Sequence, residues 1–285
     1  MAVHKDKRRS VLVTGCSSGI GKALVDELRI QGLRVFAGSR SVDSLSGVVG
    51  VEPLELDPAS PESIAKARDE VSRRTGGKLD ILINNAGQWL ESPAIETDLK
   101  AIKAMFDVNL FGVMEMNRQF SPLLIAAKGV IVNHGSMVRA MPHPMTAAYN
   151  ASKAALSQYS NTLRLELEPL DVRVVELVTG RVSSSLISIP TLPESSIYKP
   201  LEPALVKRAR EAETVQAPAV FAKRVVKSLL VANPAREIYK GTMASISWFL
   251  ESYGPKWIYD PIMRTMTGLK QHRGELAKRA SHIEA

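Results

Sequence analysis

Short apolar runs and amphipathic stretches alternate along most of this chain. The apolar runs predict strands, and they lie at residues 11–15, 34–40, 79–87, 129–136, 172–180 and 237–241, with a weaker run over 51–57. Helical periodicity lies between them, at residues 19–31, 61–74 and 146–168. Strands that are apolar nearly throughout are typical of a parallel sheet covered on both faces. The pattern predicts a doubly wound α/β fold with a mostly parallel, seven-stranded sheet.

No repeat or linker divides the chain, and 285 residues can form one large α/β domain. We predict a main domain over residues 1–241. Within it, residues 181–214 are rich in Ser and Pro, and we expect them to form a flexible substrate lid. Residues 242–285 hold two of the three tryptophans and predict a C-terminal helical extension on or near the substrate site.

Composition narrows the class of protein. Hydrophobic residues make up 45% of the chain and charged residues 23%, as in soluble globular proteins. Cys16 is the single cysteine, so no internal disulfide can form and we expect a reducing, cytoplasmic compartment. The basic N-terminus lacks a following apolar segment, so we expect neither a secretory signal nor a membrane anchor.

The net charge of +8 favours an anionic partner: nucleic acid, an acidic lipid surface or a phosphorylated small molecule. No nucleic-acid-binding motif accompanies the charge, so we expect no nucleic acid partner. In the C-terminal extension, Lys256, Arg264 and Lys270 interleave with aromatic residues. Such a face can pack on the core, roof an acyl pocket or rest on a membrane. The last alternative would place the protein at the surface of the endoplasmic reticulum or of lipid droplets.

Three glycines mark the turn from the first strand into the first helix, in the stretch "TGCSSGIGKALVDEL". Without a Cβ, they let a pyrophosphate approach the backbone near the positive end of the helix dipole. The spacing is G-x-x-x-G-x-G, for which packing alone is an alternative explanation, but the flanking strand and helix favour a dinucleotide site. The predicted contacts are Gly15, Ser17, Ser18, Gly19, Ile20 and Gly21.

The end of the second strand, "VFAGSRS", indicates which dinucleotide binds. A site for NAD usually offers a carboxylate there to the ribose 2′-hydroxyl. This stretch has no acid, whereas Ser39 and Arg40 can bond a 2′-phosphate, Arg40 through a fork of donors. We therefore predict NADP(H) as the cofactor and no metal. The alternative is that Arg40 is simply an exposed residue after a strand.

Further motifs follow in order: "NNAG" over residues 84–87, "DVNLFG" around Asn109, then Ser136 and "YNASK", which starts at Tyr149. Together with the glycine turn, they resemble the classical short-chain dehydrogenase/reductase family. The resemblance implies a Rossmann fold, a homo-oligomer and a catalytic tetrad of Asn109, Ser136, Tyr149 and Lys153. It also implies cofactor contacts at Asp57, Asn85, Ala86, Gly87, Tyr149, Lys153, Gly180, Val182 and Ser184.

The chemistry of a carbonyl reductase suits each member of this tetrad. Tyr149 would protonate the carbonyl oxygen as a general acid. The Lys153 ammonium and the oxidised nicotinamide would both favour the phenolate and so lower the pKa of the phenol. Ser136 would hold the carbonyl oxygen, and Asn109 would bind a water that carries protons. Taken singly, Ser136 could just end a strand, Asn109 could satisfy a helix kink, and the other two could form a surface pair.

Two positions depart from the family pattern. Thr179-Gly180 stands where Pro-Gly is usual, and "VVELVTGRVSSS" resembles the fungal branch of NADPH-dependent 1-acyldihydroxyacetone-phosphate reductases. That branch also includes reductases of specialised metabolism. His134 lies just before Gly135-Ser136, where small or apolar residues are more usual. We favour packing beneath the site for His134 over a role in a proton relay.

These features predict an NADPH-dependent oxidoreductase that reduces a hydrophobic ketone. The leading substrate class is a lipid-like ketone such as an acyl-dihydroxyacetone phosphate. The alternative is a ketone or alcohol of a fungal polyketide, terpenoid or steroid-like pathway, with the reaction running in either direction. A third hypothesis, an inert NADPH-binding module, is disfavoured because Tyr149 and Lys153 are both present.

Overall fold

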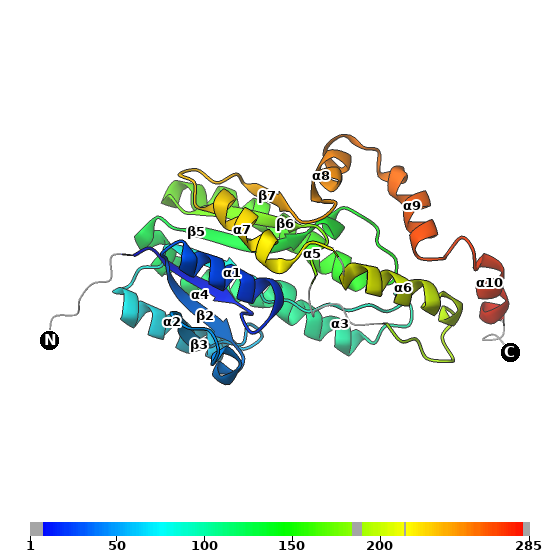
Figure 1. Ribbon diagram of the computed structural model, residues 1–285, viewed down its shortest axis with the longest axis horizontal. Coiled ribbons are helices and arrows are strands. Elements are labelled where there is room, and N and C mark those ends of the chain that lie inside the picture. Colours follow the sequence, from blue (N-terminus) through cyan, green and yellow to red (C-terminus); the bar gives the residue numbers. More distant parts are fainter. Residues whose placement is uncertain (1–7, 184–189, 214, 282–285) are drawn as a thin grey trace.

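The computed structural model describes residues 8–183, 190–213 and 215–281 (Figure 1). Seven strands form one sheet in the order β3-β2-β1-β4-β5-β6-β7, and every neighbouring pair is parallel. The strands are β1 (Ser10–Thr14), β2 (Arg34–Ser39), β3 (Glu52–Glu55), β4 (Ile81–Asn84), β5 (Val130–Ser136), β6 (Arg173–Thr179) and β7 (Glu237–Lys240). The predicted seven-stranded, doubly wound fold is confirmed.

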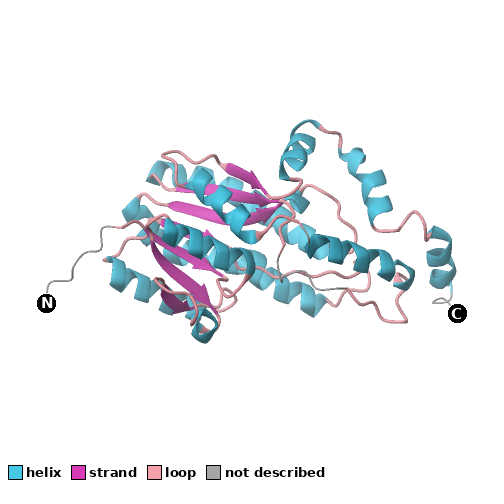
Figure 2. Ribbon diagram, in the orientation of Figure 1, coloured by secondary structure: helices cyan, strands magenta, loops and turns pink. Residues whose placement is uncertain are grey.

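Helices cover both faces of this sheet (Figure 2). They are α1 (Gly19–Ile30), α2 (Pro61–Thr75), α3 (Leu99–Phe106), α4 (Gly112–Ala127), α5 (Ala147–Leu167), α6 (Glu202–Glu213), α7 (Pro218–Leu229), α8 (Ala244–Tyr253), α9 (Tyr259–Met266) and α10 (Arg273–Ser281). Helices α1 and α7 pack on one face, and α2 and α4 pack on the other. The strands are therefore buried on both sides, which explains why they are apolar nearly throughout.

The helices α8 to α10 extend away from the sheet toward α6 (Figure 1). Leu276 of α10 packs with Leu201 and Leu205 at the start of α6. Among the described residues, no helix combines the length and apolar character that crossing a membrane requires.

The carboxyl ends of the parallel strands meet at one edge of the sheet, where doubly wound proteins bind their ligands. The order of strands reverses between β1 and β4, so a crevice is expected there. Thr14, Ser39, Asn84, Ser136 and Thr179 all end strands at this edge. The fold thus brings together the motifs that the sequence distributes over some 170 positions.

Candidate active site

The turn after β1 has a backbone that favours glycine. Gly15 and Gly19 have φ angles of 70° and 55°, in the left-handed region. A Cβ on Gly15 would lie 2.8 Å from the Cα of Ala86, and one on Gly21 would lie 2.1 Å from the carbonyl oxygen of Gly15. The helix α1 begins at Gly19, so its unpaired N–H groups and positive dipole end face this turn. The turn fits a pyrophosphate, as predicted from its glycines.

Asn85 ties the turn to the end of β4. Its side-chain amide donates to the carbonyl oxygens of Thr14 at 2.9 Å and Gly15 at 3.3 Å. In return, the Thr14 hydroxyl oxygen accepts the backbone N–H groups of Asn85 and Ala86 at 3.0 and 2.9 Å. These bonds keep the "NNAG" segment, including Gly87, beside the glycine turn. The structure thus brings two of the predicted cofactor motifs together.

His134 is half-buried and connects two neighbouring motifs. Its Nδ1 lies 2.9 Å from Oδ1 of Asn85, and its Nε2 lies 2.7 Å from the hydroxyl of Thr179. Burial, aided by the charge of Lys153, lowers the pKa of His134 to about 3. The ring is therefore neutral at physiological pH, which supports the packing role that we favoured. The two departures from the family pattern, His134 and Thr179, contact each other.

The predicted phosphate-binding residues lie at the end of β2. Ser39 is buried and its hydroxyl is 2.8 Å from that of Ser44, whereas the Arg40 side chain is exposed. Asp57 follows β3, and its Oδ1 accepts the backbone N–H of Ala59 at 3.0 Å. Both Arg40 and Asp57 therefore stand near the carboxyl ends of neighbouring strands, where the adenosine half of a dinucleotide is expected.

Two of the predicted catalytic side chains meet where β5 ends against α5. The phenol of Tyr149 lies beside the Ser136 hydroxyl, which lowers the pKa of the phenol. Lys153 lies one turn after Tyr149, its Nζ 5.8 Å from the centre of the phenol ring, and donates to the carbonyl oxygen of His134 at 2.7 Å. Both Tyr149 and Lys153 are buried, so they do not form the surface pair that we considered as an alternative.

The protein groups alone do not lower the pKa of the phenol. We expected Lys153 and the oxidised nicotinamide to favour the phenolate, but burial raises the pKa of Tyr149 to about 12, and the Ser136 hydroxyl offsets only part of this effect. Burial also lowers the pKa of Lys153 to about 8, against the opposing charge of Glu176. The phenol is thus protonated at neutral pH, as a proton donor must be.

Asn109 lies in a π-helical turn, Asp107–Phe111, between α3 and α4. Its Oδ1 accepts the backbone N–H of Gln88 at 2.7 Å, and its Nδ2 donates to the carbonyl of Gln88 at 2.9 Å and to Ser152 Oγ at 3.3 Å. The side chain thus satisfies backbone groups at a helix irregularity, which was our alternative explanation. The proton-carrying water at Asn109 stays a prediction.

The remaining predicted contacts follow β6. Gly180 is tightly packed, since a Cβ there would lie 2.2 Å from the carbonyl oxygen of Thr242. Val182 is buried. Ser184, and with it residues 184–189 and 214 of the predicted lid, lies outside the described residues.

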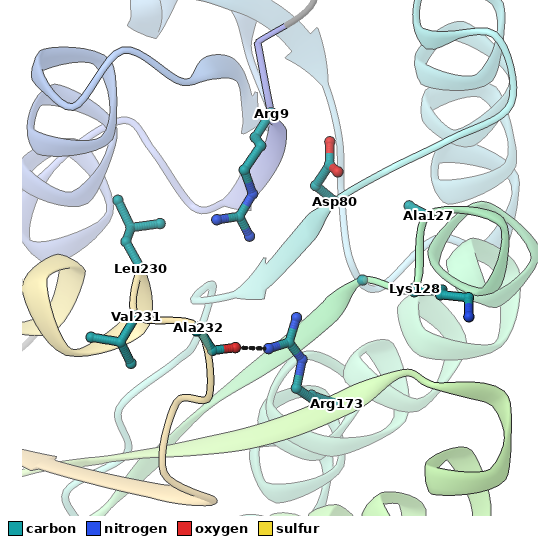
Figure 3. A pocket seen from close by; sticks show the side chains of 9 residues that line it. Arg9, Asp80, Ala127, Lys128, Arg173, Leu230, Val231 and Ala232 are labelled. Carbon is teal, nitrogen blue, oxygen red and sulfur yellow. Dashed lines mark hydrogen bonds between the residues drawn. The ribbon is translucent and has the colours of Figure 1, made fainter.

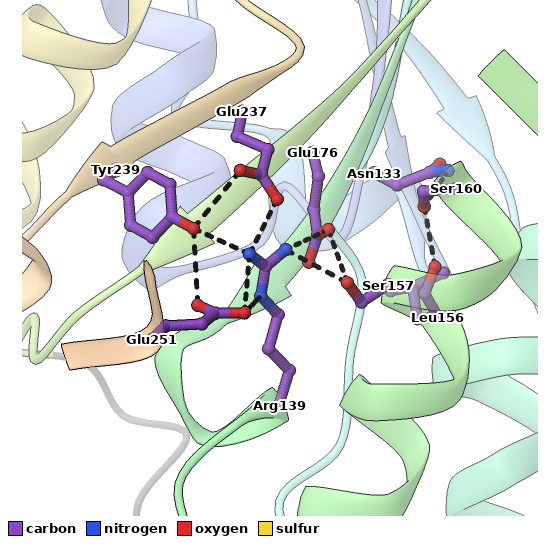
Figure 4. A network of polar contacts seen from close by, with 9 residues as sticks. All are labelled: Asn133, Arg139, Leu156, Ser157, Ser160, Glu176, Glu237, Tyr239 and Glu251. Atoms are coloured by element: carbon purple, nitrogen blue, oxygen red, sulfur yellow. Dashed lines mark hydrogen bonds and ion pairs between the residues drawn. The ribbon is translucent and has the colours of Figure 1, made fainter. Parts of the chain in front are cut away.

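The sequence did not reveal a buried arginine, Arg139, whose polar contacts Figure 4 shows. Arg139 lies three residues after Ser136, and its side chain is 5% exposed. Its guanidinium contacts three carboxylates and two hydroxyls, those of Glu176, Glu237, Glu251, Ser157 and Tyr239. The network joins the turn after β5 to α5, β6, β7 and α8, and so fixes the turn that carries Ser136.

Figure 3 shows a cavity at the other end of the strands. It is lined by Arg9, Asp80, Ala127, Lys128, Gly129, Arg173, Leu230, Val231 and Ala232. Asp80 precedes β4, and Arg173 begins β6. The cavity therefore lies at the amino ends of the strands, away from Ser136 and Tyr149, and takes no part in the site.

Comparisons with known proteins agree with this geometry. Residues 9–189 match the family model described as short chain dehydrogenase. The chain is 38% identical over 258 residues to the short-chain dehydrogenase srdE of Neurospora crassa, covering 87% of this chain and 88% of that protein. It is 40% identical over 218 residues to the NADPH-dependent 1-acyldihydroxyacetone phosphate reductase of Schizosaccharomyces pombe, covering 73% and 74%. A solved short chain dehydrogenase from Burkholderia cenocepacia in complex with NADP superposes with a TM-score of 0.69 at 29% identity, covering 89% and 95%.

Proposed function

This chain belongs to the short-chain dehydrogenase family, and we propose that it reduces the ketone of a hydrophobic, lipid-like substrate with NADPH. It is an NADP-dependent oxidoreductase that acts on alcohol or ketone groups. The observation that carries the proposal is that Tyr149, Ser136 and Lys153 are buried together, with Lys153 Nζ 5.8 Å from the centre of the phenol ring.

The cofactor fits the residues at the carboxyl edge of the sheet. The glycine turn at Gly15 and Gly19 would hold the pyrophosphate against the N-terminus of α1, and Arg40 would bind the 2′-phosphate. Lys153, which donates to a backbone carbonyl, would turn its ammonium to the ribose hydroxyls. When bound, NADPH supplies the hydride that reduces the carbonyl carbon.

The protein's own groups would handle the carbonyl oxygen. Ser136 donates a hydrogen bond to that oxygen and fixes its position. Tyr149, protonated because burial raises its pKa, gives its proton to the oxygen as negative charge develops there. The Lys153 ammonium stabilises the phenolate that remains. Both directions of the reaction use the same three groups, because in oxidation Tyr149 takes the proton back.

Apolar side chains around the phenol favour a hydrophobic substrate. Tyr149, Met105 and Val138 form a buried cluster with half-buried neighbours. Those neighbours are Trp89, Leu90, Phe106, Met137, Met141 and Ala148. The curated relative that is named as a reductase of 1-acyldihydroxyacetone phosphate supports an acylated ketone as the leading substrate class.

The test is the consumption of NADPH with a panel of ketones: an acyl-dihydroxyacetone phosphate, a steroid ketone and a polyketide-like diketone. We expect the acylated ketone to have the highest kcat/KM. Preferential reduction of the steroid or the diketone would move the protein to specialised metabolism. If NADPH binds tightly but no ketone in the panel is reduced, the inert NADPH-binding module is the better description.

The choice of cofactor can be tested at Arg40. In the Arg40→Asp variant, we expect the ratio of kcat/KM for NADPH over NADH to fall by about tenfold to a hundredfold, because a charge-assisted bond to the 2′-phosphate is replaced by repulsion. Steady-state kinetics with both cofactors measure the ratio. An unchanged ratio would place the phosphate elsewhere.

We also propose that the protein is cytoplasmic and touches anionic membranes through its C-terminal helices. The exposed apolar residues there are Ile246, Trp248, Phe249, Tyr253, Trp257, Ile262 and Met266, and Arg264 and Lys270 lie close in sequence. Flotation measures binding to phosphatidylserine vesicles. In a variant that carries both Trp248→Ser and Trp257→Ser, we expect the affinity for these vesicles to fall at least about tenfold. Equal flotation of variant and wild type would contradict membrane contact. The homo-oligomer implied by the family stays a prediction.

A further inference from the structure

Trp89 lies directly against the catalytic tyrosine. It follows the "NNAG" segment after β4, and its ring centre is 4.6 Å from that of Tyr149, with the two planes tilted by 59°. Trp89 is half-buried, whereas Tyr149 is 8% exposed. The indole therefore covers part of the phenol and keeps a face of its own open.

A ketone that receives a proton from Tyr149 must bring its oxygen to the phenol hydroxyl. The apolar cluster around that phenol includes Met137, Met141 and Leu90 besides Trp89. Among these side chains, Trp89 is the largest and the one in ring contact with Tyr149. The group next to the substrate carbonyl is therefore expected to pass over the indole, whose rigid shape limits how wide that group can be.

The position of Trp89 is set by a carboxylate two residues away. Glu91 uses both of its oxygens: Oε2 accepts the indole N–H of Trp89 at 3.3 Å, and Oε1 accepts from the guanidinium of Arg208. Arg208 belongs to α6, 117 positions further along the chain. Glu91 therefore links α6 to the wall of the catalytic site.

Arg208 also reaches the segment that leads into the catalytic helix. Its Nη1 lies 3.4 Å from Nε2 of His143, and the carbonyl oxygen of His143 accepts the side-chain amide of Asn150 at 2.9 Å. Burial and the charge of Arg208 lower the pKa of His143 to about 4, so its ring is neutral. Arg208 thus spans from the loop after β4 to the start of α5.

Stability alone does not explain such a pair. The Arg208 and Glu91 side chains are 11% and 5% exposed, and removing two charges from water costs about as much as their attraction returns. A buried ion pair is, however, directional, because each of its partners has a defined geometry. The Glu91–Arg208 pair is therefore suited to keeping the wall of the site at Trp89 in one conformation.

We propose that Trp89 determines which ketones the enzyme accepts, by limiting the width of the group beside the carbonyl, and that the Glu91–Arg208 pair holds Trp89 in place from α6. This inference rests on the proposed ketone reductase activity. Trp89 is a specificity-determining residue that contacts the substrate. Glu91 and Arg208 are positioning residues that act through it.

The first test compares two methyl ketones that differ in width, 2-octanone and 1-adamantyl methyl ketone. In Trp89→Ala, the ratio of kcat/KM for the wide over the narrow ketone should rise by about tenfold or more. Trp89→Phe, which keeps an aromatic ring, should lie between the variant and the wild type and serves if the alanine variant folds poorly. The dissociation constant for NADPH should remain unchanged. The same ratio of kcat/KM in all three proteins would overturn the proposal.

The second test concerns the ion pair. Arg208→Met should raise KM for 2-octanone more than it lowers kcat, and it should raise the ratio of kcat/KM for the wide over the narrow ketone. Arg208→Lys should bring that ratio part of the way back to the wild-type value. Lys199→Met is the matched control, because Lys199 pairs with Glu202 and Glu194 in the same segment but does not contact Glu91. A change of equal size in the control would mean that the lid segment acts as a whole and that the pair has no positioning role.

A fluorescence measurement separates this inference from the proposed function, because it needs no turnover. With Trp248 and Trp257 replaced by Phe, emission reports Trp89 alone. Adding Arg208→Met should shift that emission to longer wavelength and increase its quenching by acrylamide, whereas Lys199→Met should leave both unchanged. If no ketone is reduced but the emission shifts, the proposed activity fails and the role of the pair stands. Identical emission in both variants would overturn the positioning role.

Discussion

Replacement of Tyr149 by phenylalanine is expected to lower kcat for ketone reduction by about a thousandfold or more. General acid catalysis contributes typically 10²–10⁴-fold, and Tyr149 is the proton donor that the geometry offers. It lies beside Ser136, and its raised pKa keeps it protonated at neutral pH. The measurement is single-turnover oxidation of NADPH with an excess of ketone.

The control for Tyr149→Phe is the affinity for NADPH, measured by the fluorescence of the bound cofactor. It should change little, because the phenylalanine ring keeps the contact with Trp89 and only the hydroxyl is lost. Turnover at the wild-type rate would refute the role of Tyr149. A parallel loss of NADPH binding would instead show that the substitution disturbs the fold around α5.

The second large effect is expected at Lys153. Replacement by methionine should lower kcat/KM by about a hundredfold or more, since one preorganised charged group near a developing anion contributes on that order. For the wild type, kcat/KM for reduction should have its maximum value at pH values well below 8 and should fall as the pH rises through about 8. The reason is that burial lowers the pKa of Lys153 to about 8, so the ammonium loses its proton there. The Lys153→Met variant should lack this fall.

Substitution of Glu176 provides a second test of that pH dependence. Its charge opposes the lowered pKa of Lys153, so Glu176→Gln should move the fall in kcat/KM to lower pH. Glu176 accepts hydrogen bonds from Arg139 and Ser157, whereas Tyr239, Glu237 and Glu251 contact the guanidinium of Arg139 (Figure 4). Glu251→Gln also removes a carboxylate from Arg139 and should leave the midpoint in place. Equal shifts in both variants would mean that Lys153 does not control the profile.

Much of the fold was predictable because its signals are local. The seven predicted strands match the observed ones closely, and the expected helix at residues 146–168 corresponds to α5, Ala147–Leu167. The glycine turn could also be predicted from the sequence, because the positive φ angles at positions 15 and 19 favour glycine. The helices α3, α4, α6 and α7 were not singled out. For α3 the reason is its length, because its eight residues span little more than two turns.

The site was predictable as a set of residues but not as an electrostatic environment. The "YNASK" motif places Tyr149 and Lys153 on one helix face, as the i, i+4 spacing requires. It does not reveal that both side chains are buried, which raises the pKa of one and lowers that of the other. The effect of burial on the phenol pKa exceeds that of the neighbouring protein groups, and the effect that we expected from the oxidised nicotinamide stays a prediction.

By itself, the sequence determined the strand pattern and the glycine turn, because each depends on residues close together in the chain, and it supplied the candidate catalytic and phosphate-binding residues as motifs. Only the tertiary structure decided how Arg139 is enclosed, which partners neutral His134 has, and that Arg208 reaches Glu91 behind Trp89. These contacts join residues up to 117 positions apart. Packing of the helices on the sheet brings these residues together. The same packing excludes the water that would otherwise weaken the interactions between their charges.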